Sequence, residues 1–263
     1  MSKPAVIEKQ EEIALLRLNQ PEKANAYSSE MAESLWEAVR KLRWDDEVKA
    51  VLLVAEGAIF SGGGDLISFQ RGIDTGTITD LIEELTVILN ATALGIRRME
   101  KVFVSLVDGV CAGAGVGLAL AADISIATEN ALFVAGYAGI GAVPDGGTSF
   151  AVAEAIGRPR AADFFLTNGR IDGRRAAEIG LVSRYCESSE ALGQALDLTR
   201  KLARGPLRAF AMTKELLTKK PGLSLAEYLE SERQGLIRAS RTRDFRIGVG
   251  SFLNKETPDF RGE

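Results

Sequence analysis

The chain has 263 residues, 46% of them hydrophobic, so it is long and apolar enough to bury the core of one large domain. Its formal net charge of −4 gives no general support for a role in nucleic-acid binding. It contains no histidine and only two cysteines, which excludes a serine–histidine triad, a histidine general base, and a zinc site built from these residues alone.

The first part of the chain predicts strands and one helix. Residues 48–55 are almost continuously apolar, which is typical of a strand that is buried on both faces and lies parallel to its neighbours. Ser28 or Ser29 can cap the helix before it. In chain order, the predicted elements are a two-stranded hairpin at 5–8 and 13–18, a loop at 19–26, a helix ending near residue 43, and the strand at 48–55.

Three consecutive glycines, residues 62–64, follow this buried strand. They are either a flexible turn or a set of backbone amides that is presented to a ligand at the C-terminal end of a strand, a common place for sites in open α/β sheets. Residues 70–79 are predicted to be a mobile, polar connection. Residues 80–98 predict a long helix with apolar side chains on its inner side.

Residues 102–148 form the central stretch of the chain. A buried strand at 102–107 leads through a turn into a helix at 113–120 that is entered through glycines, and a second strand follows at 124–127. The start of such a helix has unpaired N–H groups and favours negative charge, so the stretch could hold an anion or an oxyanion, with Asp145 as a carboxylate further along. The glycine spacing fits neither a dinucleotide fingerprint nor a phosphate loop, and tight packing of the helix on the sheet explains the glycines equally well.

Strand patterns stop near residue 187, and the rest of the chain reads as helices. We therefore predict a core at 1–187 and an all-helical C-terminal part at 188–263. Asp172 is expected to cap a short helix. The predicted elements after the central stretch are helices at 149–157, 159–166 and 174–179, a strand at 181–186, and helices at 190–204, 206–218, 224–239 and 242–253.

Several of these segments together resemble the crotonase, or enoyl-CoA hydratase/isomerase, superfamily, in family order and spacing over nearly the whole chain. The resemblance implies an α/β fold built as a spiral of repeated β-β-α turns, a C-terminal helical part that forms trimers or hexamers of two trimers, and an acyl-CoA thioester as substrate. Coenzyme A would belong to that substrate, and no separate cofactor or metal is expected. The segments that carry the resemblance are residues 25–27, 60–66, 108–115, 122–124, 144–148 and 252–260.

Carried over position by position, the resemblance makes the N–H groups of Gly64 and Ala114 an oxyanion hole for the thioester oxygen. Phe252 and Lys255 are similar to a pair that reaches the adenine end of coenzyme A, often that of a neighbouring subunit. Contact in the core of the trimer is an equally good interpretation of Phe252. The positions that resemble the coenzyme-A-binding ones are Lys23, Ala24, Ala26, Gly62, Asp65, Leu66, Tyr137, Phe252 and Lys255.

The sequence departs from the hydratase pattern at two positions. Hydratases of the family carry two glutamates that activate water, and here Gly117 and Tyr137 stand in their places. Asp145 occupies the position of the single acid in Δ3,Δ2-enoyl-CoA isomerases and in the ring-opening isomerase of phenylacetate breakdown. We therefore favour an isomerase, with Asp145 as the catalytic base. Asp145 could also cap a helix that begins at residue 146.

Other functions remain open at this point. A hydratase is the first alternative. A dehalogenase-like enzyme would also use Asp145, but its family has a histidine and a tryptophan where this chain has Asn90 and Tyr137. A non-catalytic protein that binds acyl-CoA is the alternative from another class. The two cysteines and the lack of a signal-peptide pattern predict a reducing, cytoplasmic compartment, and the longest apolar run, 110–122, is too short and glycine-rich to span a bilayer.

Overall fold

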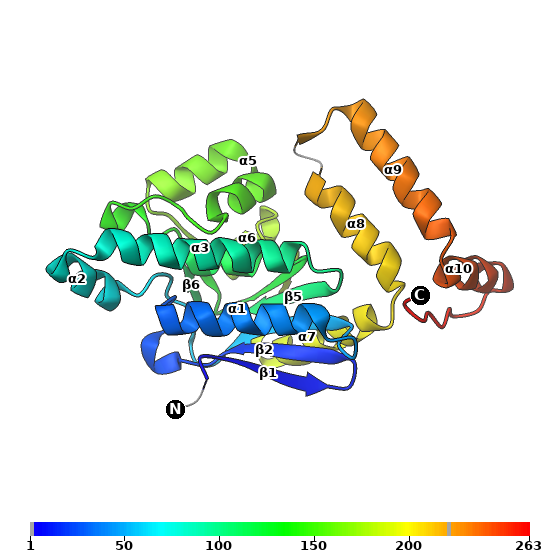
Figure 1. The fold of residues 1–263 in the computed structure, drawn as a ribbon, viewed down its shortest axis with the longest axis horizontal. Coiled ribbons are helices and arrows are strands. Elements are labelled where there is room, and N and C mark those ends of the chain that lie inside the picture. The colour runs from blue at the N-terminus through cyan, green and yellow to red at the C-terminus, as the bar shows by residue number, and fades with distance from the viewer. Residues whose placement is uncertain (1–2, 220–221) are drawn as a thin grey trace.

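The computed structural model describes residues 3–219 and 222–263 and has an α/β fold (Figure 1). A six-stranded sheet has the order β1-β2-β3-β5-β7-β10, and a smaller sheet has the order β4-β6-β8-β9. Only β1 with β2 and β8 with β9 pair antiparallel; the other pairs are parallel. The large sheet contains β1 Ala5–Gln10, β2 Ile13–Leu18, β3 Ala50–Ala55, β5 Val102–Val107, β7 Ile124–Thr128 and β10 Arg184–Cys186, and the small sheet contains β4 Ile59–Ser61, β6 Val110–Ala112, β8 Leu132–Val134 and β9 Arg170–Asp172.

Helices cover both faces of the large sheet. Strands β3 and β5 are buried along almost their whole length, as their continuous apolar sequence predicts, because α1 and α3 lie over one face and α7 packs on the other (Figure 1). The helices are α1 Ser29–Trp44, α2 Leu66–Thr75, α3 Ile78–Arg97, α4 Ala114–Leu120, α5 Thr148–Leu166, α6 Gly173–Glu178, α7 Ser188–Ala203, α8 Leu207–Lys219, α9 Leu225–Ser240 and α10 Arg243–Asn254, with short 3-10 turns η1 Pro21–Lys23 and η2 Ala138–Ile140.

The chain forms a spiral of repeated turns. Each turn adds one strand to the large sheet, the next strand to the small sheet, and then a helix, so β3, β5 and β7 are neighbours in the first sheet and β4, β6 and β8 in the second. This repeated β-β-α turn confirms the predicted fold class. It also places the carboxyl ends of β4 and β6 side by side, which matters for the site described below.

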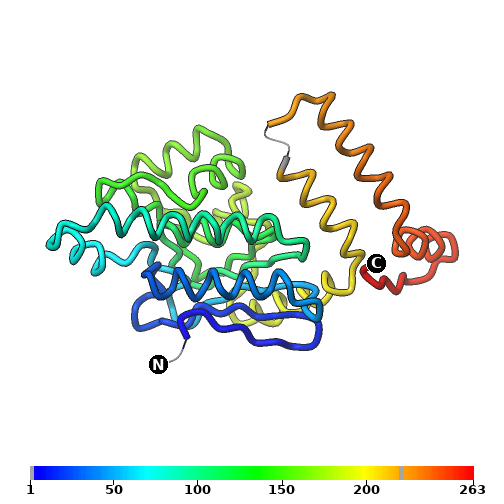
Figure 2. Tube along the Cα trace, viewed as in Figure 1, coloured from blue at the N-terminus to red at the C-terminus, as the bar shows by residue number. Residues whose placement is uncertain are grey.

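The last three helices extend away from the core. Helices α8 and α9 pack against each other, and α10 lies at the end of the molecule opposite α2 (Figures 1 and 2). Helix α7, by contrast, lies on the sheet, with Ala191 and Ala195 buried against the strands. The boundary at residue 187 stays a prediction. The large exposed apolar side chains of α8–α10 are Leu217, Leu225, Leu229, Leu236, Phe245, Val249, Phe252 and Leu253.

One expectation from the sequence needs correction. Residues 70–79 are not a mobile connection: most of them belong to α2 and the first residues of α3, joined by a turn at Gly76 with φ +72°. Asp65 caps α2, since its carboxylate accepts a hydrogen bond from Ile67 N at 3.2 Å. The two helices predicted after residue 148 are confirmed: α5 consists of two helical segments, separated at Gly157 by a non-helical backbone of φ +78° and ψ +155°.

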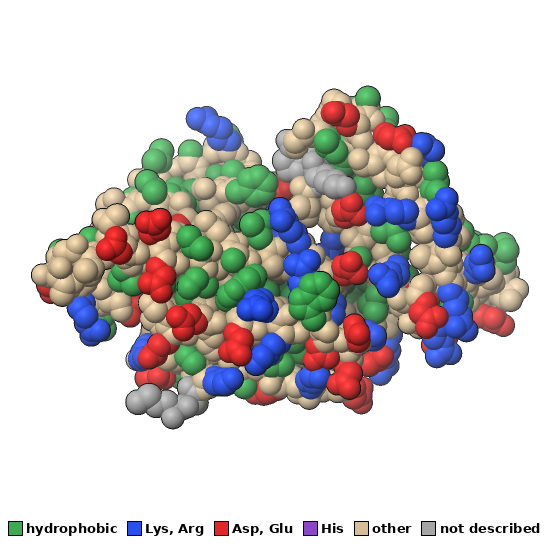
Figure 3. Space-filling view, viewed as in Figure 1, with side chains coloured by type: hydrophobic (Ala, Val, Ile, Leu, Met, Phe, Trp, Pro, Cys, Tyr) green, Lys and Arg blue, Asp and Glu red, His purple; other side chains and the backbone are tan. Residues whose placement is uncertain are grey.

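The described residues show no membrane-spanning helix and no metal-ligand cluster. Acidic and basic side chains are interspersed on the face drawn in Figure 3. Across residues 3–219 and 222–263, no helix is long and apolar enough to cross a membrane, and no three acidic or cysteine side chains gather as metal ligands would. Cys111 and Cys186 are both buried, and no disulfide links them.

Candidate active site

Two glycine segments meet at the carboxyl ends of β4 and β6. The parallel pairing of these strands brings Ser61 opposite Cys111, so the residues that follow each strand lie backbone to backbone. A Cβ on Gly63, which has φ +84°, would lie 2.9 Å from Ala112 O, and a Cβ on Gly113 would lie 3.7 Å from Gly63 Cα. A side chain at Gly63 would therefore push the two segments apart, while Gly113 is favoured by its φ of +52° rather than by lack of space.

This contact leaves two backbone N–H groups free. Ala114 is the first residue of α4, where an amide has no acceptor within the helix, and Gly64 follows the glycine turn. In the described part of the chain, neither N–H donates to a protein acceptor. Tyr27 N donates to Gly63 O at 2.7 Å and so fixes the loop from its other side. The backbone that carries the two free amides is therefore held in place by hydrogen bonding and by the contact between the two glycine segments.

Asp145 is held next to this pair of amides by a tyrosine. The Tyr137 hydroxyl donates to Asp145 Oδ1 at 2.8 Å and also lies 3.2 Å from Thr148 Oγ1. A Cβ on Gly113 would lie 3.9 Å from Tyr137 Cζ, so the same phenol ring contacts the glycine segment. Tyr137, predicted as a coenzyme-A contact, is thus a direct partner of the carboxylate.

Burial shapes the protonation of this group. It raises the pKa of Asp145 above its ordinary value, while the hydrogen bond from Tyr137 lowers it, and the burial effect is the larger. The pKa of Tyr137 is raised as well, first by burial and then by the Asp145 charge. Within the described residues, no lysine or arginine contributes to the Asp145 pKa. A carboxylate in this environment is suited to take up a proton and to give it back.

The helix-cap interpretation of Asp145 is wrong. Helix α5 begins at Thr148, its N-cap is Gly147, and no side chain caps it. Thr148 N donates to the backbone oxygen of Asp145 at 2.8 Å, which leaves the carboxylate available for other contacts. The side chain therefore has no structural task at the start of this helix.

Thr148 fills the space beside Gly117. A Cβ on Gly117 would lie 2.3 Å from Thr148 Oγ1, which is far closer than nonbonded carbon and oxygen atoms approach in proteins. One of the two hydratase glutamate positions is thus occupied by a buried threonine hydroxyl, and the other holds Tyr137. The sequence pointed to the two substitutions, but it offered no signal that Thr148 would take part.

The predicted coenzyme-A contacts fall into two groups. Ala24, Ala26, Gly62, Asp65 and Leu66 lie in the segments next to the glycine loop, where Gly62 N donates to Ala24 O at 2.8 Å. The Asp65 carboxylate already caps α2 and accepts from Ser68 Oγ at 2.5 Å.

The nearby Lys23 and the C-terminal pair make other contacts. Lys23 lies 3.2 Å from Glu30 on the surface. Phe252 and Lys255 lie at the end of α10, on the opposite side of the molecule from the glycine loop (Figure 1). Phe252 is 83% exposed and lines an apolar cavity of about 450 Å³. One chain alone does not bring this pair to its own site.

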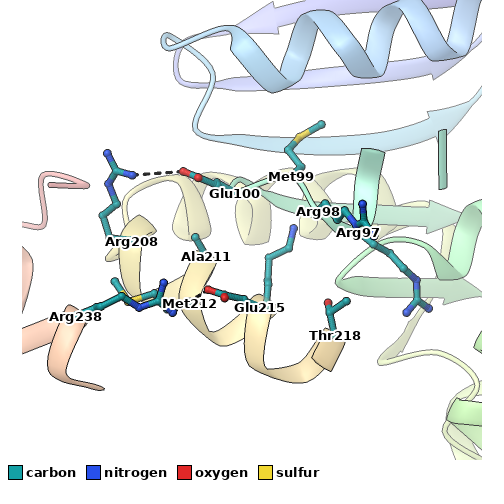
Figure 4. A pocket seen from close by; sticks show the side chains of 11 residues that line it. Arg97, Arg98, Met99, Glu100, Arg208, Ala211, Met212, Glu215, Thr218 and Arg238 are labelled. Atoms are coloured by element: carbon teal, nitrogen blue, oxygen red, sulfur yellow. Dashed lines mark hydrogen bonds and ion pairs between the residues drawn. The ribbon is translucent and has the colours of Figure 1, made fainter. Parts of the chain in front are cut away.

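A basic cavity elsewhere is not part of this site. It has a volume of about 620 Å³ and lies between the end of α3 and helices α8 and α9 (Figure 4). None of the predicted site residues lines it. Most of its cations already have carboxylate partners: Arg97 with Glu154, Arg208 with Glu100, Lys214 with Asp123 and Arg238 with Glu215.

Comparison with known proteins identifies the family. The model of the enoyl-CoA hydratase/isomerase family matches residues 8–263. The trans-2-decenoyl-[acyl-carrier-protein] isomerase of Streptococcus mutans and the 1,2-epoxyphenylacetyl-CoA isomerase of Escherichia coli are each 31% identical over 252 residues, which is 95% of both chains. A crystal structure of an enoyl-CoA hydratase from Polaromonas sp. has a TM-score of 0.92 and 30% identity, covering 98% of this chain and 99% of that one. The chain therefore belongs to the enoyl-CoA hydratase/isomerase family, within the crotonase superfamily.

Proposed function

We propose that this protein is an acyl-CoA isomerase that moves a double bond, or opens a strained ring, next to a thioester. The observation that carries the proposal is the single carboxylate: Asp145 is hydrogen-bonded to Tyr137 beside two free amides, whereas positions 117 and 137 provide no carboxylate. One acid that takes and returns a proton is sufficient for isomerisation. Hydration in this family uses two.

The geometry suggests a sequence of steps for this reaction. The N–H groups of Gly64 and Ala114 donate to the thioester oxygen, and they hold it more strongly as negative charge develops there. Asp145 takes a proton from a carbon of the acyl group and an enolate forms. The protonated Asp145 then returns the proton to another carbon of the conjugated system, which regenerates the carboxylate and completes the shift.

The named relatives support this choice. The two relatives described above are both isomerases by name; one acts on an acyl-carrier-protein thioester and the other on a coenzyme A thioester. The enolate chemistry is the same for both carriers, since the carrier lies beyond the thioester sulfur. A coenzyme A thioester is our proposal for this chain, and the matching acyl-carrier-protein thioester is the comparison to include in an assay.

We expect crotonyl-CoA hydration by this protein to be slower than isomerisation of a 3-enoyl-CoA by at least about a hundredfold, because no pair of carboxylates activates water. The measurement is a direct comparison of the two reactions over straight-chain 2-enoyl-CoAs, 3-enoyl-CoAs and ring-derived CoA esters. Brisk hydration that does not depend on Asp145 would instead favour the hydratase.

Tyr137→Phe is expected to move the acidic limb of the pH–rate profile to higher pH. The tyrosine hydrogen bond lowers the pKa of Asp145, so its loss raises that pKa further. A base acts only when deprotonated, so activity is then lost at a higher pH on acidification. At neutral pH the turnover should fall roughly tenfold, the usual contribution of a hydrogen bond to a charged group.

The matched control for this variant is Tyr185→Phe, which removes an exposed hydroxyl that accepts from Arg174 at 3.3 Å, outside the site. If the profile of Tyr137→Phe coincided with that of the wild type, Tyr137 would have no part in tuning Asp145.

We also propose that the protein assembles as a trimer, or as a hexamer of two trimers. The apolar side chains of α9 and α10 are exposed in one chain, and Phe252 and Lys255 lie at the end of α10, on the side of the molecule opposite α2 and the glycine loop before it (Figure 1). Assembly would cover the apolar side chains of α9 and α10 and bring Phe252 and Lys255 to the site of a neighbouring subunit. Light scattering at micromolar concentration should give three or six times the chain mass, and a monomer would contradict the proposal.

A further inference from the structure

A groove begins at the residues that follow Asp145 and runs along helix α3. It has a volume of about 410 Å³ and is bounded by the start of α5, by α4 and by one face of α3. Asn90, Leu94 and Arg97 line it from α3, because residues three and four apart share one face of a helix. From Asn90 to Arg97 this face extends roughly 10 Å, at about 1.5 Å per residue. Gly146 lies at the Asn90 end, since its Cβ would lie 2.6 Å from Cδ2 of the preceding residue of α3, Leu89.

The groove adjoins both parts of the proposed site. Gly146 and Gly147, which line it, directly follow Asp145, and a Cβ on Gly147 would meet nothing within 4 Å, so the space beside this residue is open. Gly117, which also lines the groove, lies about one helical turn after Ala114 on α4. An acyl group whose thioester oxygen is held by the Ala114 N–H therefore has a path past Asp145 into the groove.

Arg97 gives the far end of the groove a positive charge. Among the described residues it is the one charged side chain that lines the groove, and most of the other lining side chains are small or apolar. Its Cζ lies 5.5 Å from the centre of the Phe150 ring, which is also in the lining, and its Nη1 lies 3.4 Å from Glu154 Oε2. This ion pair is long and partly exposed, so it contributes little to stability. A guanidinium has five N–H donors, and one pair leaves most of them for a ligand.

We propose that Arg97 is a specificity-determining residue that binds a carboxylate at the far end of the acyl group, and that the preferred substrates are thioesters of dicarboxylic acids. The inference rests on the isomerase proposal and names the substrate class of that site. An apolar groove with one cation at its end suits a hydrocarbon segment that ends in an anion. The segment replaces water along the apolar lining, and the carboxylate accepts two parallel hydrogen bonds from the guanidinium.

The test is a binding measurement with ligands that do not react. Dissociation constants are determined by calorimetry for saturated acyl-CoAs of six, eight and ten carbons, each ending in either a methyl or a carboxylate group. The wild type should prefer the carboxylate by about tenfold to a hundredfold, the effect of hydrogen bonds to a charged group. The preference should be strongest at one length, because Arg97 lies at a fixed distance from the oxyanion hole. Arg97→Met, which keeps an apolar stem, should remove the preference by weakening only the carboxylate ligands, and Arg97→Lys should retain part of it.

Two controls separate ligand binding from the ion pair between α3 and α5. Glu154→Gln removes the partner but keeps the Arg97 guanidinium, so the preference for the carboxylate should persist or increase. Arg175→Met changes an arginine that forms a surface pair with Glu178 at 3.1 Å, outside the groove, and should leave the preference unchanged.

Equal affinities for the two kinds of ligand at every length in the wild type would overturn the proposal, and so would an unchanged preference in Arg97→Met. Arg97 would then serve only to link α3 to α5 through Glu154. Failure of the isomerase proposal would look different: no Asp145-dependent proton exchange would occur, while the ratio of affinities would still be measurable.

Discussion

We expect Asp145→Asn to lower isomerisation by about a hundredfold to ten-thousandfold, the usual contribution of a general base, while the protein stays folded and still binds acyl-CoA. The amide oxygen of asparagine can accept the hydrogen bond from Tyr137, so the position keeps its main contact. The substitution also removes a partly buried charge. No helix cap is lost, because the Asp145 carboxylate does not cap a helix. Binding should persist, since in the proposed mechanism the N–H groups of Gly64 and Ala114 hold the thioester oxygen independently of Asp145.

Two measurements check this result. Solvent deuterium incorporation at the α- or γ-carbon reports proton transfer directly, and it should disappear together with turnover. Asp172→Asn is the control: the same substitution is made at a residue that caps α6, accepting from Arg175 N at 2.8 Å, away from the site. Exchange and turnover near the wild-type level in Asp145→Asn would place the base elsewhere or favour a non-catalytic acyl-CoA-binding protein.

The large sheet was predictable because each of its long strands carries a local signal. The continuous apolar run of β3 and the glycine-entered helix after β5 indicate buried parallel strands without any knowledge of their partners. The small sheet was missed. Its strands β4, β6, β8 and β9 have three residues each, too few for an alternating pattern, and they are stabilised by pairing over long sequence distances.

The site shows the same limit. The glycines at 62–64 and 113–115 could each be interpreted as backbone presented to a ligand or as a feature of turns and packing, and their contact with each other depends on the pairing of β4 with β6. The partners of Asp145 were harder still. Tyr137 reaches the Asp145 carboxylate from a loop, and the Thr148 hydroxyl at the start of α5 contacts that tyrosine. Nothing local in the sequence distinguishes a hydroxyl that meets a carboxylate from one that meets solvent.

The packing around position 117 leads to a prediction about the stability of a variant with a side chain there. Gly117→Ala should lower the free energy of unfolding by about 1–3 kcal/mol, the usual cost of overpacking, because its Cβ would lie 2.3 Å from Thr148 Oγ1 and 3.3 Å from Thr148 Cα. Both residues are buried, so neither can move aside freely. Denaturant unfolding measures the change. Gly193→Ala in α7 is the matched control, since nothing lies within 4 Å of its Cβ, and it should be more stable than the wild type by about 0.5–1 kcal/mol.

The clash can be separated from the helix itself with a second substitution. Thr148→Ala removes the atom that lies 2.3 Å from the new Cβ. Adding Gly117→Ala to the Thr148→Ala protein should therefore cost much less stability than adding it to the wild type. For the same reason, Gly117→Glu should give an unstable protein and no hydratase, because the new carboxylate cannot reach its position while Thr148 Oγ1 stays hydrogen-bonded to Tyr137. A Gly117→Ala protein as stable as the wild type would show that Thr148 yields easily, and position 117 would then be open to a glutamate.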